Sequence, residues 1–393
     1  MSFRNENMKM KKQFAVIQNI PSPYRLHLFN VMWKQLEAKG IDFHVHFMSD
    51  MSRGHDERPL SWRNPKIDFP HTYWKDWGVS HYHFNPGLLR HLRNIYPDWL
   101  LIGSTFDTIT GFLASQGFSY ATKCAWSVVK TKTTGQLGGW KGWVKRRAFL
   151  HCQYVGVPGR DACRYIALHQ ERTEKKMPKT VFLPNLVDET RFKPRWEWSE
   201  SDMMDVRRNI GVGADEMIAI TPARLDSSKG LLEYLEVLTS EMLNGWRVVI
   251  LGQGYLRESL LNLAQERGIA NNVKILGFVP YSEMPKLYAA ADLFVLPSNR
   301  DPNPLSVIEA LHSGLPVAVS QMAGNIDEAV TERKNGWILP IKEPQRYSQV
   351  LQEIFSMGRP RLRDMGRHSA IENAQFWNSE KAVGNFLLGV GVL

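Results

Sequence analysis

The chain has 393 residues, of which 43% are hydrophobic, 11% aromatic and 22% charged. This composition is typical of a globular protein and excludes a fibrous or disordered one, and the length suggests two domains. Three cysteines without a Cys-x-x-Cys pair argue against a disulfide framework or a thiolate zinc site. Because no apolar run suits a signal peptide or approaches the ~20 residues of a membrane-spanning helix, we expect a cytoplasmic protein.

The net charge of +10 is unevenly divided along the chain. Residues 1–190 hold 27 Lys and Arg against 15 Asp and Glu, which gives +12, and the remaining residues carry −2. A solvated basic surface explains this excess as well as a specific partner does. The specific alternative is that the first half faces an anionic membrane surface, a phosphorylated lipid or nucleic acid.

The first half alternates apolar runs with helical periodicity, which is the pattern of βα units in a parallel sheet. Ser22 and Pro23 mark the start of the first helix, and Gly40 ends it. The strands predicted here are Gln13–Ile20, Ile41–Met48, Trp99–Gly103, Tyr120–Ser127, Gln153–Val157 and Thr180–Leu183. The other predicted helices lie near Pro86–Ile95, near Thr108–Gly117 and from Gly159 onward.

The segment Asp188–Gly213 is charged and loop-like, and it is the candidate connection between the domains. The βα rhythm then restarts with the predicted strands Met217–Thr221, Trp246–Leu251, Val273–Leu276, Leu293–Pro297, Pro316–Ser320 and Gly336–Leu339. The predicted helices are Gly230–Met242, Tyr255–Arg267, Tyr281–Ala289, Pro304–Ser313, Asn325–Val330 and Ser379–Leu388. We therefore expect an α/β fold with two Rossmann-like doubly wound domains, at residues 1–190 and 191–365. A C-terminal helix in residues 366–393 is expected to pack back on the first domain.

Ligands of doubly wound sheets bind beyond the carboxyl ends of the strands. In the second half, the loop after Met217–Thr221 holds Arg224 and Lys229 directly before a helix that begins near Gly230. A guanidinium, an ammonium and the amides of a helix N-terminus all favour a phosphate anion. The loop is a candidate diphosphate site, although a solvated basic loop has the same appearance in sequence.

The loop after Leu293–Pro297 holds a second candidate group. Asp301 lies in the loop, and Glu309 lies on the first turns of the helix that Pro304 opens. A carboxylate there can accept hydrogen bonds from a vicinal diol such as that of ribose, or it can stabilise the helix N-terminus by ~0.3–1 kcal/mol. The turn Gly252-Gln253-Gly254 is a weaker signal, which a tight strand-to-helix connection explains equally well.

These loops resemble those of the family 4 retaining glycosyltransferases of the GT-B fold. Arg224–Gly230 is similar to the family pattern of Arg, four residues and Lys-Gly, and Asp301 and Glu309 occupy the ends of its acidic pattern with seven residues between them. Further similar segments are Pro21–Arg25, Pro184–Phe192, Gly277–Tyr281, Ala291-Asp292 and Ala310–Val317. The resemblance implies two Rossmann-like domains that face each other across a cleft.

The resemblance also implies roles. Arg224 and Lys229 would hold the donor diphosphate, Glu309 the ribose hydroxyls, and Asp301 the transferred sugar. The remaining donor contacts would come from the backbone at Asn303, Pro304, Leu305 and Ser306 and, at the base, at Phe278 and Val279. The donor would be a UDP- or GDP-sugar, with neither a metal nor a tightly bound cofactor.

The family implies a retaining hexosyltransferase in cell-surface polysaccharide or glycolipid synthesis, whose acceptor is a saccharide or a lipid-linked saccharide. The chain departs from the family pattern at two places. Asp301 stands where a glutamate is usual, and Pro302-Asn303-Pro304 replaces a common glycine-bearing loop and removes amide donors. Both departures concern the part of the loop that would contact the transferred sugar.

The acceptor is expected in the first half. Tyr24 and Arg25 follow the first strand, and His27 is the histidine nearest to that loop. The segment Lys130–Phe149 interleaves Lys and Arg with Trp, which suits either an anionic membrane surface or an ordinary amphipathic helix. The first alternative would place the protein peripherally on the inner membrane face.

Two rival functions remain open. A nucleotide-sugar epimerase of the same fold would turn over the donor without any acceptor. A nucleic-acid-binding protein would use the basic first half, but the sequence has no recognition helix, zinc finger or RNA-binding sheet motif. Nucleic acid is therefore not expected as a partner.

Overall fold

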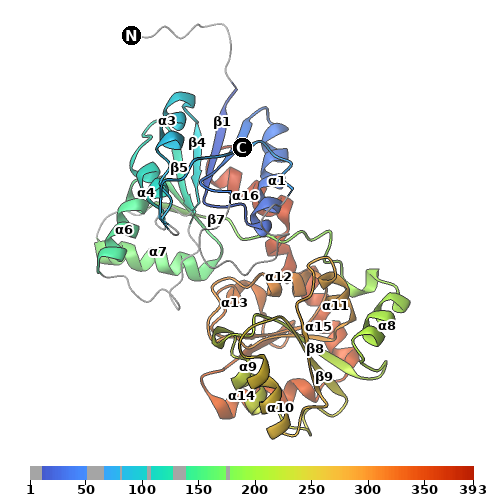
Figure 1. Ribbon diagram of the computed structural model, residues 1–393. Coiled ribbons are helices and arrows are strands. Elements are labelled where there is room, and N and C mark those ends of the chain that lie inside the picture. The colour runs from blue at the N-terminus through green and yellow to red at the C-terminus, as the bar shows by residue number, and fades with distance from the viewer. Residues whose placement is uncertain (1–10, 51–65, 80–81, 104–107, 127–138, 174–177) are drawn as a thin grey trace, which may run out of the picture. The chain divides into compact units, whose positions relative to one another are not determined.

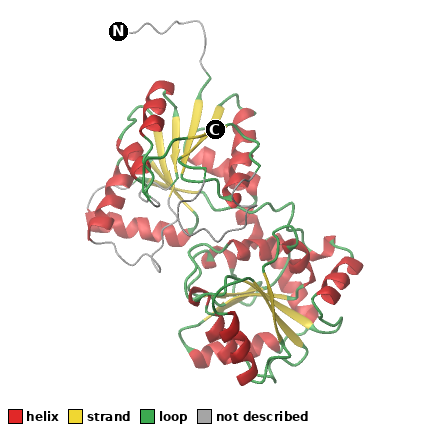
Figure 2. Ribbon diagram, in the orientation of Figure 1, coloured by secondary structure: helices red, strands yellow, loops and turns green. Residues whose placement is uncertain are grey.

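The computed structural model describes residues 11–50, 66–79, 82–103, 108–126, 139–173 and 178–393. Its contacts divide the chain into two compact units. The first unit comprises Met1–Pro158, Ala162–Leu186 and Ser379–Leu393, and the second comprises Gly159–Asp161 and Val187–Asn378. Each unit is built around one sheet flanked by helices (Figure 2).

The sheet of the first unit has the strand order β3-β2-β1-β4-β5-β6-β7, and all neighbouring strands are parallel. The strands are β1 (Gln13–Gln18), β2 (Asp42–Phe47), β3 (His71–Tyr73), β4 (Trp99–Ile102), β5 (Thr122–Trp126), β6 (Tyr154–Val157) and β7 (Lys179–Phe182). Every residue of β4 is buried, as expected of a central strand that helices cover on both faces.

The helices of the first half are α1 (Pro23–Glu37), α3 (Pro86–Ile95), α4 (Ile109–Gln116), α6 (Gly139–Leu150) and α7 (Arg160–Thr173). Apolar side chains of α3, α4, α6 and α7 share one core with β1, β4, β5 and β6. The C-terminal helix α16 (Ser379–Gly389) belongs to the same unit and packs against α1 and β7 (Figure 1). Ser22 is the N-cap residue of α1, as the sequence predicts.

The sheet of the second unit has the strand order β10-β9-β8-β11-β12-β13, again with all neighbours parallel. The strands are β8 (Met217–Pro222), β9 (Trp246–Leu251), β10 (Val273–Gly277), β11 (Leu293–Leu296), β12 (Val317–Ser320) and β13 (Gly336–Leu339). This is the Rossmann order, and its direction reverses between β8 and β11. The predicted fold class, with two Rossmann-like domains, is confirmed.

The helices of the second unit are α8 (Glu200–Asn209), α9 (Leu231–Val237), α10 (Arg257–Glu266), α11 (Met284–Ala290), α12 (Leu305–His312), α13 (Ile326–Ala329), α14 (Pro344–Phe355) and α15 (Arg359–Ile371). Helices α9, α10 and α14 lie on one face of the sheet, and α11, α12 and α13 lie on the other (Figure 1). Tyr234 of α9 and Tyr347 of α14 are among the buried residues of the core on the first of these faces.

The structure corrects the interpretation of the segment between the two sheets. The segment Asp188–Gly213 is not a loop throughout, because it contains the 3-10 helix η1 (Arg195–Glu197) and α8. The side chain of Ser199 caps α8 by accepting a hydrogen bond from the backbone N–H of Asp202. A serine followed three residues later by an acidic residue is a helix-start signal, and it was present in the sequence.

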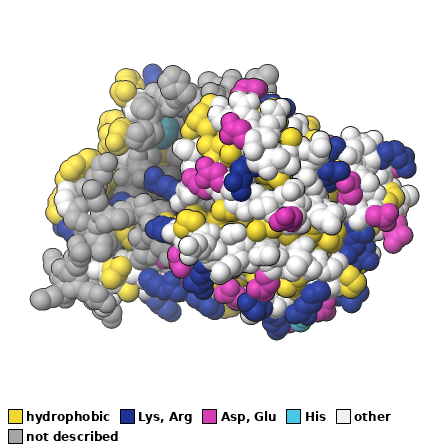
Figure 3. All heavy atoms as spheres, turned by 90° about the horizontal axis from the view of Figure 1, so that it is seen from below, with side chains coloured by type: hydrophobic (Ala, Val, Ile, Leu, Met, Phe, Trp, Pro, Cys, Tyr) yellow, Lys and Arg dark blue, Asp and Glu magenta, His cyan; other side chains and the backbone are white. Residues whose placement is uncertain are grey.

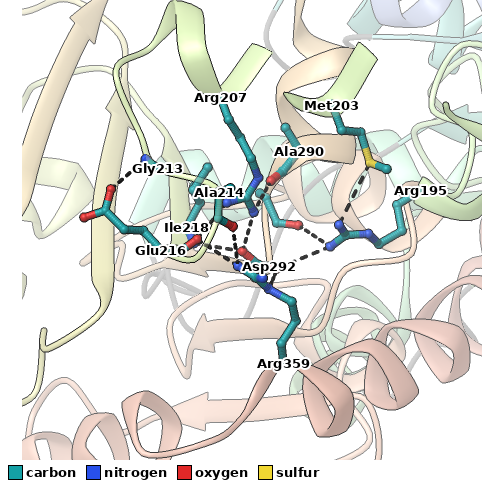
Figure 4. Close-up of polar contacts among 11 residues, drawn as sticks. Arg195, Met203, Arg207, Gly213, Ala214, Glu216, Ile218, Ala290, Asp292 and Arg359 are labelled. Atoms are coloured by element: carbon teal, nitrogen blue, oxygen red, sulfur yellow. Dashed lines mark hydrogen bonds and ion pairs between the residues drawn. The ribbon is translucent and has the colours of Figure 1, made fainter. Parts of the chain in front are cut away.

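A buried carboxylate ties these elements to the amino ends of β8 and β11 (Figure 4). Asp292, directly before β11, is 3% exposed. Arg207 of α8 donates from Nη2 to its Oδ2 at 2.6 Å, and Arg195 of η1 donates from Nη1 to its Oδ1 at 3.3 Å. Arg359 of α15 donates from Nε to Oδ1 at 3.1 Å, and the backbone N–H of Ile218 donates to Oδ2 at 3.0 Å.

The three guanidiniums also bind backbone carbonyls around this carboxylate. Arg207 donates to the carbonyls of Glu216 and Ala290, and Arg359 donates to that of Glu216 at 2.8 Å. Burial lowers the pKa of Arg195, and the charge of Asp292 opposes that shift. One negative charge therefore holds three cationic side chains, from three helical elements, against the sheet.

We expect Asp292→Ala to lower the free energy of unfolding by about 3–5 kcal/mol, because it leaves buried guanidiniums without their counter-charge. Denaturation in urea, followed by circular dichroism, would measure the change. Asp364→Ala is the matched control, since Asp364 pairs with Arg361 at 3.1 Å on an exposed helix surface. A loss from Asp292→Ala no larger than that of the control, which we expect to be below about 1 kcal/mol, would contradict the assignment.

Candidate functional site

The loops that the sequence singles out follow β8 and β11, the two strands on either side of the reversal in strand order of the second sheet. In open α/β sheets this edge is where ligands bind, because the connections diverge there to opposite faces and leave a crevice. The loop after β8 leads through the 3-10 helix η2 (Ser227–Lys229) into α9. The loop after β11 leads into α12, and Pro304 is the N-cap residue of that helix.

Lys229 and Asp301 are in contact across the two loops. The distance from Lys229 Nζ to Asp301 Oδ2 is 2.5 Å, and the two side chains are 17% and 12% exposed. The loops are joined at two further places, where the amide of Asn299 donates to the carbonyl of Ser227 at 3.1 Å and the N–H of Arg300 donates to that of Ser228 at 3.0 Å. The two predicted loops therefore form one continuous surface.

Arg224 lies in the same loop as Lys229 but has a different partner. Its Nη2 is 3.1 Å from Oδ2 of Asp226, and its side chain is 77% exposed. The side chain of Asp226 also accepts the backbone N–H of Ser228, which fixes the start of η2. Helix α9, which follows, is shorter than predicted and has seven residues. Arg224 and Lys229 are the two basic side chains of this loop, and each lies beside a carboxylate.

Three glycines allow the loops to pack closely. Gly230 has a φ of +63°, and a Cβ there would lie 2.3 Å from the carbonyl oxygen of Pro297. In the turn after β9, a Cβ at Gly252 would lie 1.9 Å from the carbonyl oxygen of Ala223, and one at Gly254 would lie 2.3 Å from that of Leu225. The sequence left open what the Gly252-Gln253-Gly254 turn does, and the structure shows that it supports the backbone of the Arg224 loop.

On β8 and in the loop after β11, three buried polar atoms have no hydrogen-bond partner among the described residues. They are Thr221 Oγ1 in β8, Ser298 Oγ in the residues after β11, and Asn303 Nδ2 in the loop before α12. A buried polar group without a partner costs about 1–3 kcal/mol, so native structures keep few of them. Such atoms also occur elsewhere among the described residues, and these three lie where a polar ligand bound beyond the strand ends would give them partners.

Glu309 lies on α12 and is 7% exposed. Its Oε2 accepts a hydrogen bond from the hydroxyl of Tyr288 at 2.8 Å. Burial raises the pKa of Glu309 to about 7, and hydrogen bonds from Tyr288 and Tyr281 act in the opposite direction. Neither tyrosine was among the site residues proposed from the sequence. Both lie in the stretch from Gly277 to Asp292, whose two ends resemble the family pattern.

Among the other residues predicted on the donor side, Phe278 and Val279 directly follow β10. Phe278 is 51% exposed and follows β10, the edge strand of the sheet. Pro304 is buried, whereas Asn303, Leu305 and Ser306 are half-buried. The assignment of these residues to base, sugar or phosphate stays a prediction.

The residues predicted on the acceptor side lie within the first unit. Tyr24 is half-buried, and Arg25 is 8% exposed, so Arg25 is not a solvated arginine. Arg25 donates from Nη1 to Oε1 of Gln18 at 2.8 Å, and its guanidinium carbon lies 3.9 Å from the ring centre of Trp126. His27 hydrogen-bonds the hydroxyl of Ser379 at 2.8 Å, which ties α1 to the C-terminal helix of the same unit.

The basic segment Lys130–Phe149 is described from residue 139 onward as α6, and its first part lies outside the described residues. Trp140 and Trp143 are 68% and 56% exposed, whereas Phe149 is buried in the core of the first unit. Among the helices that the structure describes, none is long and apolar enough to cross a membrane. On the face drawn in Figure 3, basic and acidic side chains are interspersed.

A cavity of about 570 Å³ lies elsewhere, in the first unit. Gln13, Asp42 and His44, which line it, stand at the amino ends of β1 and β2, opposite to the edge where the predicted acceptor loop begins. The described residues contain no group of three His, Cys, Asp or Glu arranged to hold a metal ion.

Residues 203–375 match the family model for Glycosyl transferases group 1. The chain is 32% identical over 181 residues to an uncharacterized glycosyltransferase of Methanocaldococcus jannaschii, and the match covers 45% of each chain. It is 28% identical over 194 residues to a GDP-mannose-dependent alpha-(1-6)-phosphatidylinositol monomannoside mannosyltransferase of Mycobacterium tuberculosis, which covers 47% of this chain and 49% of that protein. These matches thus span about half the length of the curated relatives.

The fold extends over the whole chain. An Anabaena protein solved in complex with UDP superimposes with a TM-score of 0.73, at 16% identity, over 97% of this chain and 100% of the other. The two Rossmann-like units define the chain as a GT-B protein. Its second unit carries a group 1 glycosyltransferase domain, which confirms the resemblance to family 4 glycosyltransferases drawn from the sequence motifs.

We expect Gly230→Ala to lower the free energy of unfolding by about 2–3 kcal/mol, because the new methyl group would force the Lys229 loop away from Pro297. Gly268→Ala is the matched control, since Gly268 has a φ of +68° but no atom within 4 Å of the added Cβ. The control should lose about 1 kcal/mol from backbone strain alone. Equal losses for the two variants in urea denaturation would show that the close packing of the loops is not required.

Proposed function

We propose that this chain is a nucleotide-sugar-dependent glycosyltransferase with its donor site at the carboxyl ends of β8 and β11. The observation that carries the proposal is the Lys229 ammonium, which lies beside Asp301 at the point where the strand order of the second sheet reverses. The match to the glycosyltransferase model supports it, because residues 203–375 include both loops. The UDP bound to the Anabaena protein of the same fold is consistent with a nucleotide ligand.

The charges in these loops suit the reaction. Transfer of a sugar breaks the bond between its anomeric carbon and a diphosphate, so that negative charge accumulates on the departing phosphate. Fixed cations aimed at that charge lower the barrier more than most other devices available to a protein. Arg224 and Lys229 would supply them, and Asp301 would contact the transferred sugar.

Glu309 would accept the ribose hydroxyls, and the exposed ring of Phe278 lies on the loop that would meet the base. The Anabaena protein was solved with UDP, whereas the M. tuberculosis relative is named for GDP-mannose. We therefore propose a UDP- or GDP-sugar as the donor. The orphaned Nδ2 of Asn303 would meet the sugar in the loop where Pro302 and Pro304 cannot donate.

We infer retention of the anomeric configuration, since the departing diphosphate can itself deprotonate the incoming hydroxyl on the same face. A nucleophilic carboxylate is then not required. The acceptor would be a saccharide or a lipid-linked saccharide in the synthesis of a cell-surface polysaccharide or glycolipid. The M. tuberculosis relative is named for a phosphatidylinositol monomannoside, which supports the lipid-linked alternative. Tyr24 and Arg25 remain the candidates for contacting it.

The exposed Trp140 and Trp143 support a further part of the proposal, a peripheral contact of α6 with an anionic membrane. Indole rings favour the headgroup region of a bilayer, and Lys or Arg beside them meet anionic lipid. Lys145, Arg146 and Arg147 follow the two tryptophans on the same helix. Such a contact would bring the protein to a lipid-linked acceptor.

We expect Arg224→Ala and Lys229→Ala each to lower kcat by about 100-fold or more while the protein stays folded, because each removes a cation from the leaving group. Donor hydrolysis and thermal shift with UDP-, GDP-, ADP- and dTDP-sugars would identify the donor for this assay. Arg208→Ala is the matched control, since Arg208 is an exposed arginine of α8 that pairs with Asp205. Near-normal sugar transfer by a folded Arg224→Ala variant would refute the role of Arg224.

For the membrane contact, we expect replacement of Lys145, Arg146 and Arg147 by Gln to weaken co-sedimentation with anionic vesicles by on the order of a hundredfold, at about 1 kcal/mol per cation. A control variant with Gln at the exposed residues Lys286, Arg333 and Arg361 removes the same number of charges from the second unit. Vesicle binding that persists in the α6 variant, or that falls equally in the α6 variant and the control variant, would contradict a membrane contact through α6.

A further inference from the structure

The environment of Glu309 carries an inference beyond its proposed contact with ribose. Its carboxyl lies almost fully out of solvent, and Tyr288 of α11, which is 0% exposed, donates to its Oε2 at 2.8 Å. The same hydroxyl lies 3.4 Å from the carbonyl oxygen of Ser306, one turn before Glu309 on α12. Tyr288 therefore joins α11 to the first turn of α12 at the position of the carboxylate.

A second phenol reaches the same carboxyl from the segment between β10 and α11. Tyr281 acts on the same carboxyl, and its hydroxyl lowers the pKa of Glu309. The guanidinium carbon of Arg191 lies 4.9 Å from the centre of the Tyr281 ring, and the ring of Phe192 lies 5.6 Å from Tyr281 and 5.7 Å from Tyr288. The Arg-Phe pair that precedes η1 thus packs directly on the two tyrosines that hold Glu309.

The electrostatics of this group are a balance of opposed effects. Burial raises the pKa of Glu309 to about 7, and the hydrogen bonds from Tyr288 and Tyr281 and the charge of Arg191 lower it, in that order of size. The charge of Asp188 raises the pKa of Tyr281 rather than shifting the pKa of Glu309. Removing a phenol hydroxyl would therefore raise the pKa of Glu309 further and leave less of it ionised at neutral pH.

We propose that Tyr281 and Tyr288 are positioning residues of the donor site, whose hydroxyls hold the Glu309 carboxyl in place and stabilise its ionised form so that it can accept the hydroxyl hydrogens of a bound ribose. This rests on the proposed nucleotide-sugar function. An ionised carboxylate has about four lone-pair sites, so two phenols leave room for two ribose hydroxyls. Arg191 and Phe192 pack on the ring of Tyr281. The segment between β7 and η1, which carries both residues, is therefore part of the proposed nucleotide site.

The consequence is a pH dependence of nucleotide affinity. Because the protonated carboxyl is a poor acceptor, affinity for a nucleoside diphosphate falls as the pH drops through the pKa of Glu309. The raised pKa puts that midpoint near pH 7 in the wild type. In Tyr288→Phe and Tyr281→Phe the midpoint moves to higher pH, because the carboxylate has lost a donor.

The experiment measures the Kd of UDP and GDP by titration calorimetry between pH 6 and 9, with the full chain and each variant. We express each result as the ratio of variant to wild-type Kd, because the ratio cancels the ionisation of the nucleotide itself. A midpoint raised by about one pH unit gives a Kd about fivefold weaker than the wild type at pH 7 and nearly equal to it at pH 9. Recovery at high pH separates this role from a purely structural one.

Tyr234→Phe is the matched control, because Tyr234 is 0% exposed and its hydroxyl has no hydrogen-bond partner among the residues that the structure describes. Its Kd ratio should stay near one at every pH. Arg191→Gln leaves both phenols in place and should shift the midpoint in the same direction by a smaller amount, which provides a test even where a tyrosine variant does not fold. With 2′-deoxy-UDP, which offers one hydroxyl fewer, the fall in affinity below pH 7 should be smaller than with UDP.

Two different failures can be told apart. If the wild type binds no nucleoside diphosphate at any pH, the proposed function itself is wrong. If the wild type binds but the ratios for Tyr288→Phe, Tyr281→Phe and Arg191→Gln do not change with pH, the positioning role is overturned and the nucleotide site stands.

Discussion

One buried carboxylate supports much of the second unit. Asp292 holds Arg195, Arg207 and Arg359, and with them η1, α8 and α15, against the amino ends of β8 and β11. The carboxyl ends of the same two strands carry the loops with Lys229 and Asp301. A parallel strand of four to six residues leaves little freedom between its ends, so the charge cluster at one edge of the sheet fixes the starting points of the loops at the other.

The fold class could be predicted because the strands are continuous apolar runs separated by helical periodicity. In the second half, the strands Trp246–Leu251 and Gly336–Leu339 were predicted to the residue. Helix α8 was missed because its face toward α11 holds few apolar residues and Arg207 packs there through its bond to Asp292. The strand β3 was missed because its three residues, two half-buried and one exposed, give no alternating pattern.

The candidate site also has a part that the sequence predicts and a part that it does not. Sequence spacing places Arg224 and Lys229 in one loop and Asp301 and Glu309 in another, and strand order explains why those loops are adjacent. Sequence spacing does not reveal which side chains pair, because the Lys229–Asp301 contact spans 72 positions. For the same reason the tyrosines around Glu309, and the stacking of Arg25 on Trp126, were found in the structure.

The pairing of Lys229 with Asp301 affects how the proposed reaction would begin and end. An ammonium that already has a carboxylate partner exchanges one anion for another when a diphosphate arrives, so the net gain in binding is smaller than an isolated lysine would provide. In the proposed reaction, the exchange would weaken the hold of Lys229 on Asp301 as the phosphates bind. After transfer, the carboxylate would compete with the nucleoside diphosphate for Lys229, which would favour release of that product.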